Sequence, residues 1–231
     1  MSRKRIPVAP QGEGQEPQVK RGIQARTPNQ DTYLKAIEEN WVTLAHGPSG
    51  TGKDYCAVGK AIEYKLQKRV EKILICRPAV EAGEAIGYLK GDYESKLSPY
   101  VQHFYDILDE QVGKSTIIGW EKSDQLEVLP LGLIRGRTWK NSFVILSEAQ
   151  NATLQQLIMF LTRIGTNTKI VINGDLEQSD LGKRARGGFS YCLERLFNLE
   201  NVGIVQLTDS DIVRSPIIGP ILERLRKYER E

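Results

Sequence analysis

Short apolar runs alternate with amphipathic stretches along the chain from residue 27 onward. Five runs are short, rich in β-branched residues and nearly continuous in hydrophobicity: WVTLAHG (41–47), KILICR (72–77), FVILSE (143–148), KIVINGD (169–175) and VGIVQL (202–207). Such runs are typical of strands buried on both faces of a parallel sheet. Strands that alternate with helices predict a doubly wound α/β fold, with a mainly parallel sheet and helices on both of its faces.

The clearest helical stretch is TLQQLIMFLTRIG (153–165). Thr153 and Gln156 have the spacing of a capping box, and Gly165 is expected to end the helix. The expected buried face of this helix consists of Leu154, Leu157, Ile158 and Leu161.

Two parts of the chain fall outside this alternation. The stretch from about 78 to 142 is longer than one crossover needs, so we expect it to hold an inserted helix (ESKLSPYVQHFYDILDEQV, 94–112) and a short extra strand (QLEVLP, 125–130). Residues 1–26 are rich in Pro, Gly, Gln, Arg and Lys, and they bury too little apolar surface to offset the entropy of ordering. The sequence therefore predicts a flexible basic arm (1–26) followed by one domain (27–231).

The composition excludes several classes of protein. The three cysteines are far apart and form no C-x-x-C pair, which argues against a disulfide framework and a zinc site. No apolar run approaches the roughly 18 residues of a membrane span, and the N-terminal segment lacks the apolar core of a secretory signal. The net charge of +3, from 32 basic and 29 acidic residues, permits a nucleic-acid partner without requiring one. We expect a soluble cytoplasmic protein.

The segment HGPSGTGKDYCA (46–57) contains the spacing G-x-x-x-x-G-K of a phosphate-binding loop. Glycines let backbone N–H groups turn around phosphate oxygens, the following helix presents its positive end, and Lys53 reaches the terminal phosphates. An apolar strand precedes the loop and an apolar helix face follows it, formed by Ala57, Val58, Ala61 and Ile62. The predicted nucleotide-binding residues of the loop are Gly47, Pro48, Ser49, Gly50, Thr51, Gly52, Lys53 and Asp54.

Two positions depart from the usual pattern of such loops. The residue after the lysine is usually Ser or Thr, but here it is Asp54. A second buried strand usually ends in Asp-Glu, where Asp helps to hold Mg²⁺ and Glu orients the attacking water. The strand FVILSEAQN ends instead in Ser147-Glu148. Glu148 is the expected catalytic residue, and a surface acid at a strand end is the alternative interpretation.

Six segments together resemble the PhoH family of P-loop ATPases, whose core resembles that of superfamily 1 helicases. They occur in the expected order and cover nearly everything from residue 27 to about 225. The segments are RPAVEAGEAIGYLKGD (77–92), PLGLIRGRTW (130–139), FVILSEAQNAT (143–153), FLTRIG (160–165), INGDLEQSDL (172–181) and DIVRSP (211–216). Larger bacterial members carry an additional N-terminal domain, so the chain resembles a short form.

The resemblance implies that two residue types are exchanged, because the family pattern has Thr at position 54 and Asp at position 147. In P-loop enzymes this hydroxyl and this carboxylate lie side by side at the metal. Our leading hypothesis is compensation: Asp54 supplies the carboxylate to Mg²⁺, and Ser147 supplies the hydroxyl or holds a metal-bound water. The alternative is two unlinked losses that leave a degenerate site, since a carboxylate beside Lys53 repels phosphates and could pair with that lysine.

The resemblance also implies roles for residues beyond the loop. Gln178, in a G-D-x-x-Q element, is expected to contact the γ-phosphate. Gln30 resembles a glutamine that reads adenine through one donor and one acceptor, with helix capping as the alternative. Arg214, in DIVRSP, is positioned like an arginine that neutralises transition-state charge. Arg135 and Arg137 are alternatives for that task, and a salt bridge is the alternative interpretation of each arginine.

The function implied by the resemblance is ATP binding and hydrolysis with Mg²⁺, coupled to RNA or single-stranded DNA, in a homo-oligomeric and hexameric ring. Two rivals are a catalytically silenced, nucleotide-gated module that binds nucleic acid, and a small-molecule kinase. His46 and His103 lack metal-ligand spacing and are assigned no chemistry. Candidates for contact with nucleic acid are Arg77, Lys183, Arg184, Arg186, Tyr88 and Tyr93. A solvated loop is the alternative interpretation of the basic cluster, and core or surface packing is the alternative for the two tyrosines.

Overall fold

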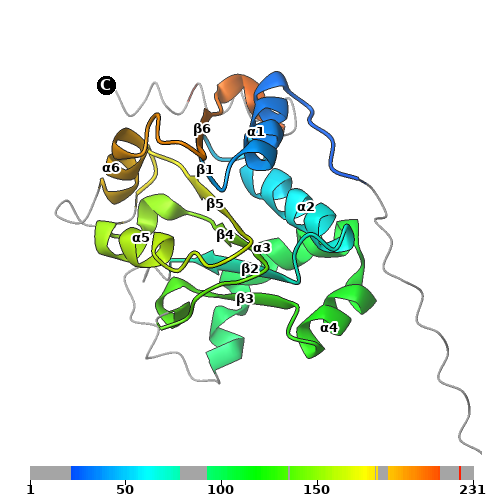
Figure 1. Cartoon of the computed structure of the whole chain (residues 1–231). Coiled ribbons are helices and arrows are strands. Elements are labelled where there is room, and N and C mark those ends of the chain that lie inside the picture. The colour runs from blue at the N-terminus through cyan, green and yellow to red at the C-terminus, as the bar shows by residue number, and fades with distance from the viewer. Residues whose placement is uncertain are drawn as a thin grey trace, which may run out of the picture.

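The computed structural model describes residues 22–78, 93–134, 136–179, 181, 187–213 and 224, with the side chains of 93–100 excepted. The expected N-terminal arm lies outside the described residues up to residue 21. The described strands form one sheet in the order β3-β2-β4-β5-β1-β6, and every paired strand is parallel (Figure 1). The strands are β1 (Val42–His46), β2 (Lys72–Arg77), β3 (Leu126–Pro130), β4 (Ser142–Leu146), β5 (Thr168–Gly174) and β6 (Val202–Gln206).

Helices cover both faces of this sheet, which confirms the doubly wound α/β fold. The α-helices are α1 (Pro28–Glu39), α2 (Lys53–Leu66), α3 (Tyr93–Gln111), α4 (Lys114–Lys122), α5 (Leu154–Leu161) and α6 (Gly188–Arg195). Helices α5 and α6 lie on one side of the sheet, and α1 and α2 lie on the other (Figure 1). Short 3₁₀ turns occur at η2 (Leu131–Ile134), η3 (Ala149–Asn151) and η4 (Asp209–Asp211).

The near-continuous apolar strands fill both cores because successive side chains point to opposite faces. In β2, Ile73 and Ile75 belong to the core on the side of helices α1–α4, whereas Leu74 and Cys76 belong to the core on the side of α5 and α6. The α2 face expected from the sequence is confirmed, since Ala57, Val58, Ala61 and Ile62 are all buried.

The α5 helix agrees with the sequence at its start and departs from it at its end. The capping box between Thr153 and Gln156 is confirmed. The predicted stop at Gly165 is wrong, because the helix ends at Leu161. Gly165 instead permits a close approach of two chain segments, since a Cβ there would lie 2.1 Å from the backbone oxygen of Trp139.

The predicted buried face of α5 is correct for Leu157 and wrong for Ile158, which is 51% exposed. Phe160 is fully buried instead and packs against Trp139, with ring centroids 4.9 Å apart. The buried face of α5 therefore includes Phe160, which belongs to the same core cluster as Leu157 and Trp139.

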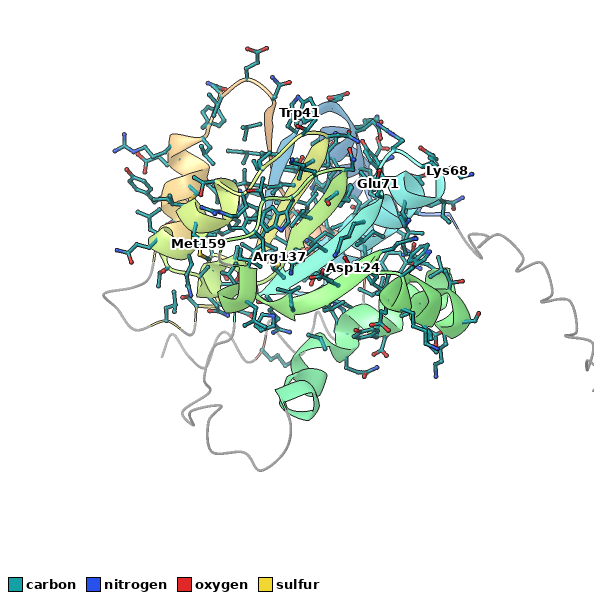
Figure 2. All side chains as sticks on the ribbon, turned by 60° about the horizontal axis from the view of Figure 1, so that its bottom comes forward. Trp41, Lys68, Glu71, Asp124, Arg137 and Met159 are labelled. Atoms are coloured by element: carbon teal, nitrogen blue, oxygen red, sulfur yellow. The ribbon has the colours of Figure 1, made fainter. Side chains whose placement is uncertain are left out.

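The inserted helix and the extra strand are confirmed as α3 and β3, and β3 is the edge strand beside β2. Glu127 in β3 accepts two hydrogen bonds from the Arg137 guanidinium, at 2.6 and 2.7 Å, and it also contacts the Lys72 ammonium. These contacts lower the pKa of Glu127 to about 2, with Arg137 as the largest cause. Arg137 therefore makes a salt bridge, which was the alternative interpretation of this residue. Figure 2 shows Arg137 beside β3.

Candidate functional site

The candidate site lies where β1, β4 and β5 end. Strand β5 lies between the other two, with His46 paired to Gly174 and Leu146 paired to Ile172, so the three carboxyl ends are adjacent. A cavity of about 460 Å³ opens there. Sequence-predicted residues that line it are Ser49, Gly50, Gly52, Lys53, Asp54, Ser147, Glu148 and Gln178. The structure thus brings most of the expected site together.

The loop between β1 and α2 has the backbone geometry that its glycines allow. Gly52 has φ 80° and caps the start of α2, and a Cβ there would lie 2.8 Å from Nε2 of Gln30. Gly47 passes so close to residue 207 that a Cβ would lie 2.2 Å from the Leu207 backbone oxygen. Side chains at these positions would clash or strain the loop, which explains why glycines occupy them.

The Lys53 ammonium donates hydrogen bonds to the backbone oxygens of Gly47, at 2.6 Å, and Pro48, at 2.8 Å. It also lies 3.3 Å from Oγ1 of Thr51, which is fully buried. Burial lowers the pKa of Lys53, and the nearby carboxylates, Asp54 first among them, oppose that shift. The loop carbonyls hold this ammonium at the cavity.

The two exchanged residues are in direct contact. The Ser147 hydroxyl donates a hydrogen bond of 2.7 Å to Oδ2 of Asp54, although Ser147 follows β4 and Asp54 lies in α2. Asn173 donates a second hydrogen bond of 2.9 Å to Oδ1 of the same carboxylate. The Asp54 carboxylate is therefore held by Ser147 and Asn173, while Lys53 bonds to loop carbonyls.

The spacing of the oxygen atoms of Asp54 and Ser147 fits a magnesium ion. Neighbouring ligands at 2.0–2.1 Å in an octahedron lie about 2.9 Å apart, close to the separation of the Asp54 Oδ2 and Ser147 Oγ atoms. Mg²⁺ usually takes one or two carboxylates, with water and phosphate completing its shell. Within the described residues no group of three or more His, Cys, Asp or Glu side chains could hold a metal by itself.

Glu148 adopts a left-handed backbone conformation, with φ 54° and ψ 40°. Such a conformation costs a non-glycine residue of order 1–3 kcal/mol, and it persists only where surrounding contacts enforce it. Nε2 of Gln150 donates a 2.6 Å hydrogen bond to the Glu148 carboxylate, while Oε1 of Gln150 accepts one of 2.9 Å from the backbone N–H of Asp175. Gln150 therefore ties Glu148 to the loop that carries Gln178.

Gln30 lies beside the loop and is 4% exposed. Its Nε2 donates to the Thr51 backbone oxygen at 3.0 Å, and its Oε1 accepts from the Arg26 backbone N–H at 2.8 Å. The N-cap of α1 is Thr27, whose side chain accepts from the Gln30 N–H. It also lines a second cavity of about 270 Å³, together with Tyr55 and Glu110. Both cavities share Gly50 and Gly52. Adenine recognition by Gln30 stays a prediction.

Three residues of the site were not predicted from the sequence. Asn173 belongs to a motif that was recognised in the sequence, but its hydrogen bond to Asp54 could not be predicted from that motif. Tyr33, from α1, donates a 2.5 Å hydrogen bond to Oδ1 of Asn173. No sequence motif indicated that Tyr33 belongs to the site. His103 was assigned no chemistry, yet it lines the cavity with Nε2 3.7 Å from Oδ2 of Asp54. It comes from α3, which the sequence could not place beside the loop.

Several predicted residues lie outside the described part of the chain. Arg214 is one of them, and its neighbour Val213 donates its N–H to the Gly50 backbone oxygen at 3.1 Å and lines both cavities. Arg77 is described and lines the larger cavity. The others outside the described residues are Arg135, Tyr88, Lys183, Arg184, Arg186 and the side chain of Tyr93.

Within the described ranges, none of the helices combines the length and the apolar character that crossing a membrane requires.

Solved structures with a similar arrangement include two Pif1 helicases. The Candida albicans enzyme has a TM-score of 0.40 at 11% identity, over 81% of this chain and 40% of the other. A Bacteroides Pif1 bound to single-stranded DNA has a TM-score of 0.39 at 16% identity, over 89% of this chain and 47% of the other.

Sequence comparisons identify much nearer relatives. PhoH-like proteins of Mycobacterium tuberculosis and Bacillus subtilis are 39% and 38% identical over 90% of this chain, and the match covers 59% and 65% of their lengths. Protein PhoH of Escherichia coli is 41% identical over 84% of this chain and 56% of its own length. The model of the family described as PhoH-like protein matches residues 22–226. The chain therefore belongs to the PhoH-like protein family, and its fold is that of a P-loop NTPase.

Proposed function

We propose that this protein binds ATP together with Mg²⁺ and hydrolyses the γ-phosphate bond. The loop from Gly47 to Lys53 holds the phosphates, and Asp54 and Ser147 hold the ion. Mg²⁺ supplies positive charge that offsets the phosphate oxygens. Glu148 orients the attacking water or accepts its proton, while Gln178 and Arg214 contact the terminal phosphate.

The single observation that carries this proposal is the 2.7 Å contact between Ser147 and Asp54 inside the loop cavity. A hydroxyl and a carboxylate are kept side by side although their positions in the chain are exchanged. Two unlinked losses would have no reason to leave one hydroxyl and one carboxylate, which are the two groups that the usual pattern supplies. The Lys53 ammonium, which bonds to the loop carbonyls, further supports a loop prepared for phosphate.

The base of the nucleotide would enter the smaller cavity, across the loop at Gly50 and Gly52. Gln30 keeps one amide hydrogen and one oxygen lone pair beyond its two hydrogen bonds. Adenine presents a matching donor and acceptor at its N6 and N7 edge.

We also infer that turnover is coupled to RNA or single-stranded DNA in a homo-oligomeric ring, with a hexamer as the expected form. Family membership is the main support for this part. Arg77 adds a cation at the cavity, and the net charge of +3 is compatible with a polyanion. The expected setting is the cytoplasm, because the cysteines Cys56, Cys76 and Cys192 are buried free thiols.

The experiment is phosphate release from ATP with and without Mg²⁺, repeated with single-stranded RNA and single-stranded DNA. The proposal predicts release that requires Mg²⁺ and rises when nucleic acid is added. ATP binding and oligomerisation without phosphate release would favour the silenced, nucleotide-gated module. Transfer of phosphate to an acceptor other than water would favour a kinase.

A further inference from the structure

The chain of contacts that reaches Asp54 extends beyond the cavity into the core. Tyr33 donates to Oδ1 of Asn173 at 2.5 Å, and Nδ2 of Asn173 donates to Oδ1 of Asp54 at 2.9 Å. Ser147 completes the set from the other side, at 2.7 Å from Oδ2. Tyr33 of α1, Asn173 of β5 and Ser147, which follows β4, therefore form one connected set of contacts around the carboxylate that Asp54 of α2 carries.

A carboxylate at position 54 needs such support more than a threonine would. Asp54 follows Lys53 directly, and an unrestrained carboxylate could turn toward that ammonium. A hydrogen bond to each of its oxygens fixes the plane of the group instead. With Oδ1 engaged by Asn173, Oδ2 and the Ser147 hydroxyl are the pair that can face an ion.

The orientation of the Asn173 amide decides whether this arrangement works. An amide has a donor end and an acceptor end, and the acceptor end would repel the Asp54 carboxylate. The Tyr33 hydroxyl donates to the amide oxygen and so keeps the NH₂ group toward Asp54. Tyr33 is fully buried and Asn173 is 1% exposed, so bulk water does not replace either contact.

We propose that Asn173 and Tyr33 are positioning residues which orient the Asp54 carboxylate and thereby set the affinity of the loop site for a divalent cation. This inference rests on the proposed function, because it takes Asp54 and Ser147 as the cation-binding pair. It adds that Tyr33 acts only through Asn173. Neither residue is assigned contact with the reacting atoms.

The test is the binding of a fluorescent ADP analogue to the full chain at increasing Mg²⁺ concentration. In Tyr33→Phe, which removes one oxygen atom, we expect the Mg²⁺ midpoint to rise about tenfold, the change that 1.4 kcal/mol produces. Asn173→Ala is expected to shift it at least as far. Adding Tyr33→Phe to Asn173→Ala should cause no further shift, because the path from Tyr33 to Asp54 is already broken.

The matched control is Tyr64→Phe. Tyr64 is also buried and accepts a 3.0 Å hydrogen bond from Arg69, but it lies near the opposite end of α2. The Tyr64→Phe variant should be less stable than the natural chain, and its Mg²⁺ midpoint should be unchanged. Thermal unfolding of every variant separates the two effects, and if Tyr33→Phe does not fold, Asn173→Ala carries the test.

An unchanged midpoint in Tyr33→Phe or in Asn173→Ala would overturn the inference, and so would simple addition of the two effects. These results leave the proposed function intact, provided that the natural chain binds nucleotide in a Mg²⁺-dependent way. If the natural chain binds the nucleotide equally well without Mg²⁺, the proposed metal pair is wrong and the inference falls with it. If it binds no nucleotide at all, the proposed function itself is wrong.

Discussion

The Ser147 hydroxyl lies 2.7 Å from Oδ2 of Asp54, although Ser147 follows a strand and Asp54 lies in the first turn of a helix that is distant in the sequence. In the usual pattern of the family the carboxylate follows the strand and the hydroxyl opens the helix. Here the hydroxyl and the carboxylate have exchanged positions in the sequence, and the two groups are still in contact. A compensated site accounts for this geometry without a separate explanation for each departure.

Replacing Glu148 by Gln should reduce phosphate release by about 10²–10⁴-fold, the range associated with loss of a general acid–base group. Nucleotide binding should persist, because Gln keeps the shape of the side chain and the loop is unchanged. Glu177→Gln is the matched control, since Glu177 is exposed and lies near the same site. Equal loss in both variants, or an active Glu148→Gln protein, would remove Glu148 from the mechanism.

Gly52→Ala should weaken nucleotide binding and destabilise the chain by about 1 kcal/mol or more, since a non-glycine residue is strained at positive φ. The new Cβ would also press on Nε2 of Gln30, which lies 2.8 Å from its ideal position. Gly119→Ala is the control, because Gly119 lies within helix α4 and a Cβ there meets nothing within 4 Å. It should be neutral or stabilising. Calorimetry with nucleotide titration checks both, and a neutral Gly52→Ala would contradict the strained-loop account.

The ion pairs of Glu127 should make stability depend on pH in the acid range. Its folded pKa of about 2 lies below the ordinary value of 4.5, so its contribution is fully present above pH 4.5 and is lost as the pH falls toward 2. Glu127→Gln should therefore lower the free energy of unfolding at pH 7 and flatten its fall in this range. Urea unfolding at a series of pH values measures the effect, and the exposed Glu200→Gln serves as control. Parallel curves for the natural chain and Glu127→Gln would show that the pairing does not stabilise the edge strand.

The sequence was sufficient to predict the parallel sheet and the loop between β1 and α2, because buried parallel strands and glycine spacing are local signals. It also placed Asp54 beside Ser147, since the motifs that contain them meet at a metal in P-loop proteins. The Asn173 contact could not be predicted in the same way. It depends on β5 lying between β1 and β4, and the order of strands in a sheet is decided by the packing of the whole domain.

Long-range packing also explains the other differences. Ile158 and Phe160 are both apolar, and the packing of the folded domain buries Phe160, which contacts Trp139, and leaves Ile158 exposed. His103 reaches the cavity because α3 packs on α2, and neither its neighbours in the chain nor its spacing from other residues reveals that position. Helical periodicity gives the existence of a helix more reliably than its rotation or its partners.

Mg²⁺-dependent phosphate release in the natural chain, Asp54→Thr, Ser147→Asp and the double variant distinguishes a compensated metal pair from a degenerate site. Asp54→Thr leaves two hydroxyls and no carboxylate, and Ser147→Asp leaves two carboxylates that repel each other. We predict turnover in the natural chain and the double variant and loss in each single variant, a strong coupling between the two positions. An inert natural chain whose double variant gains activity would contradict compensation and identify a silenced site.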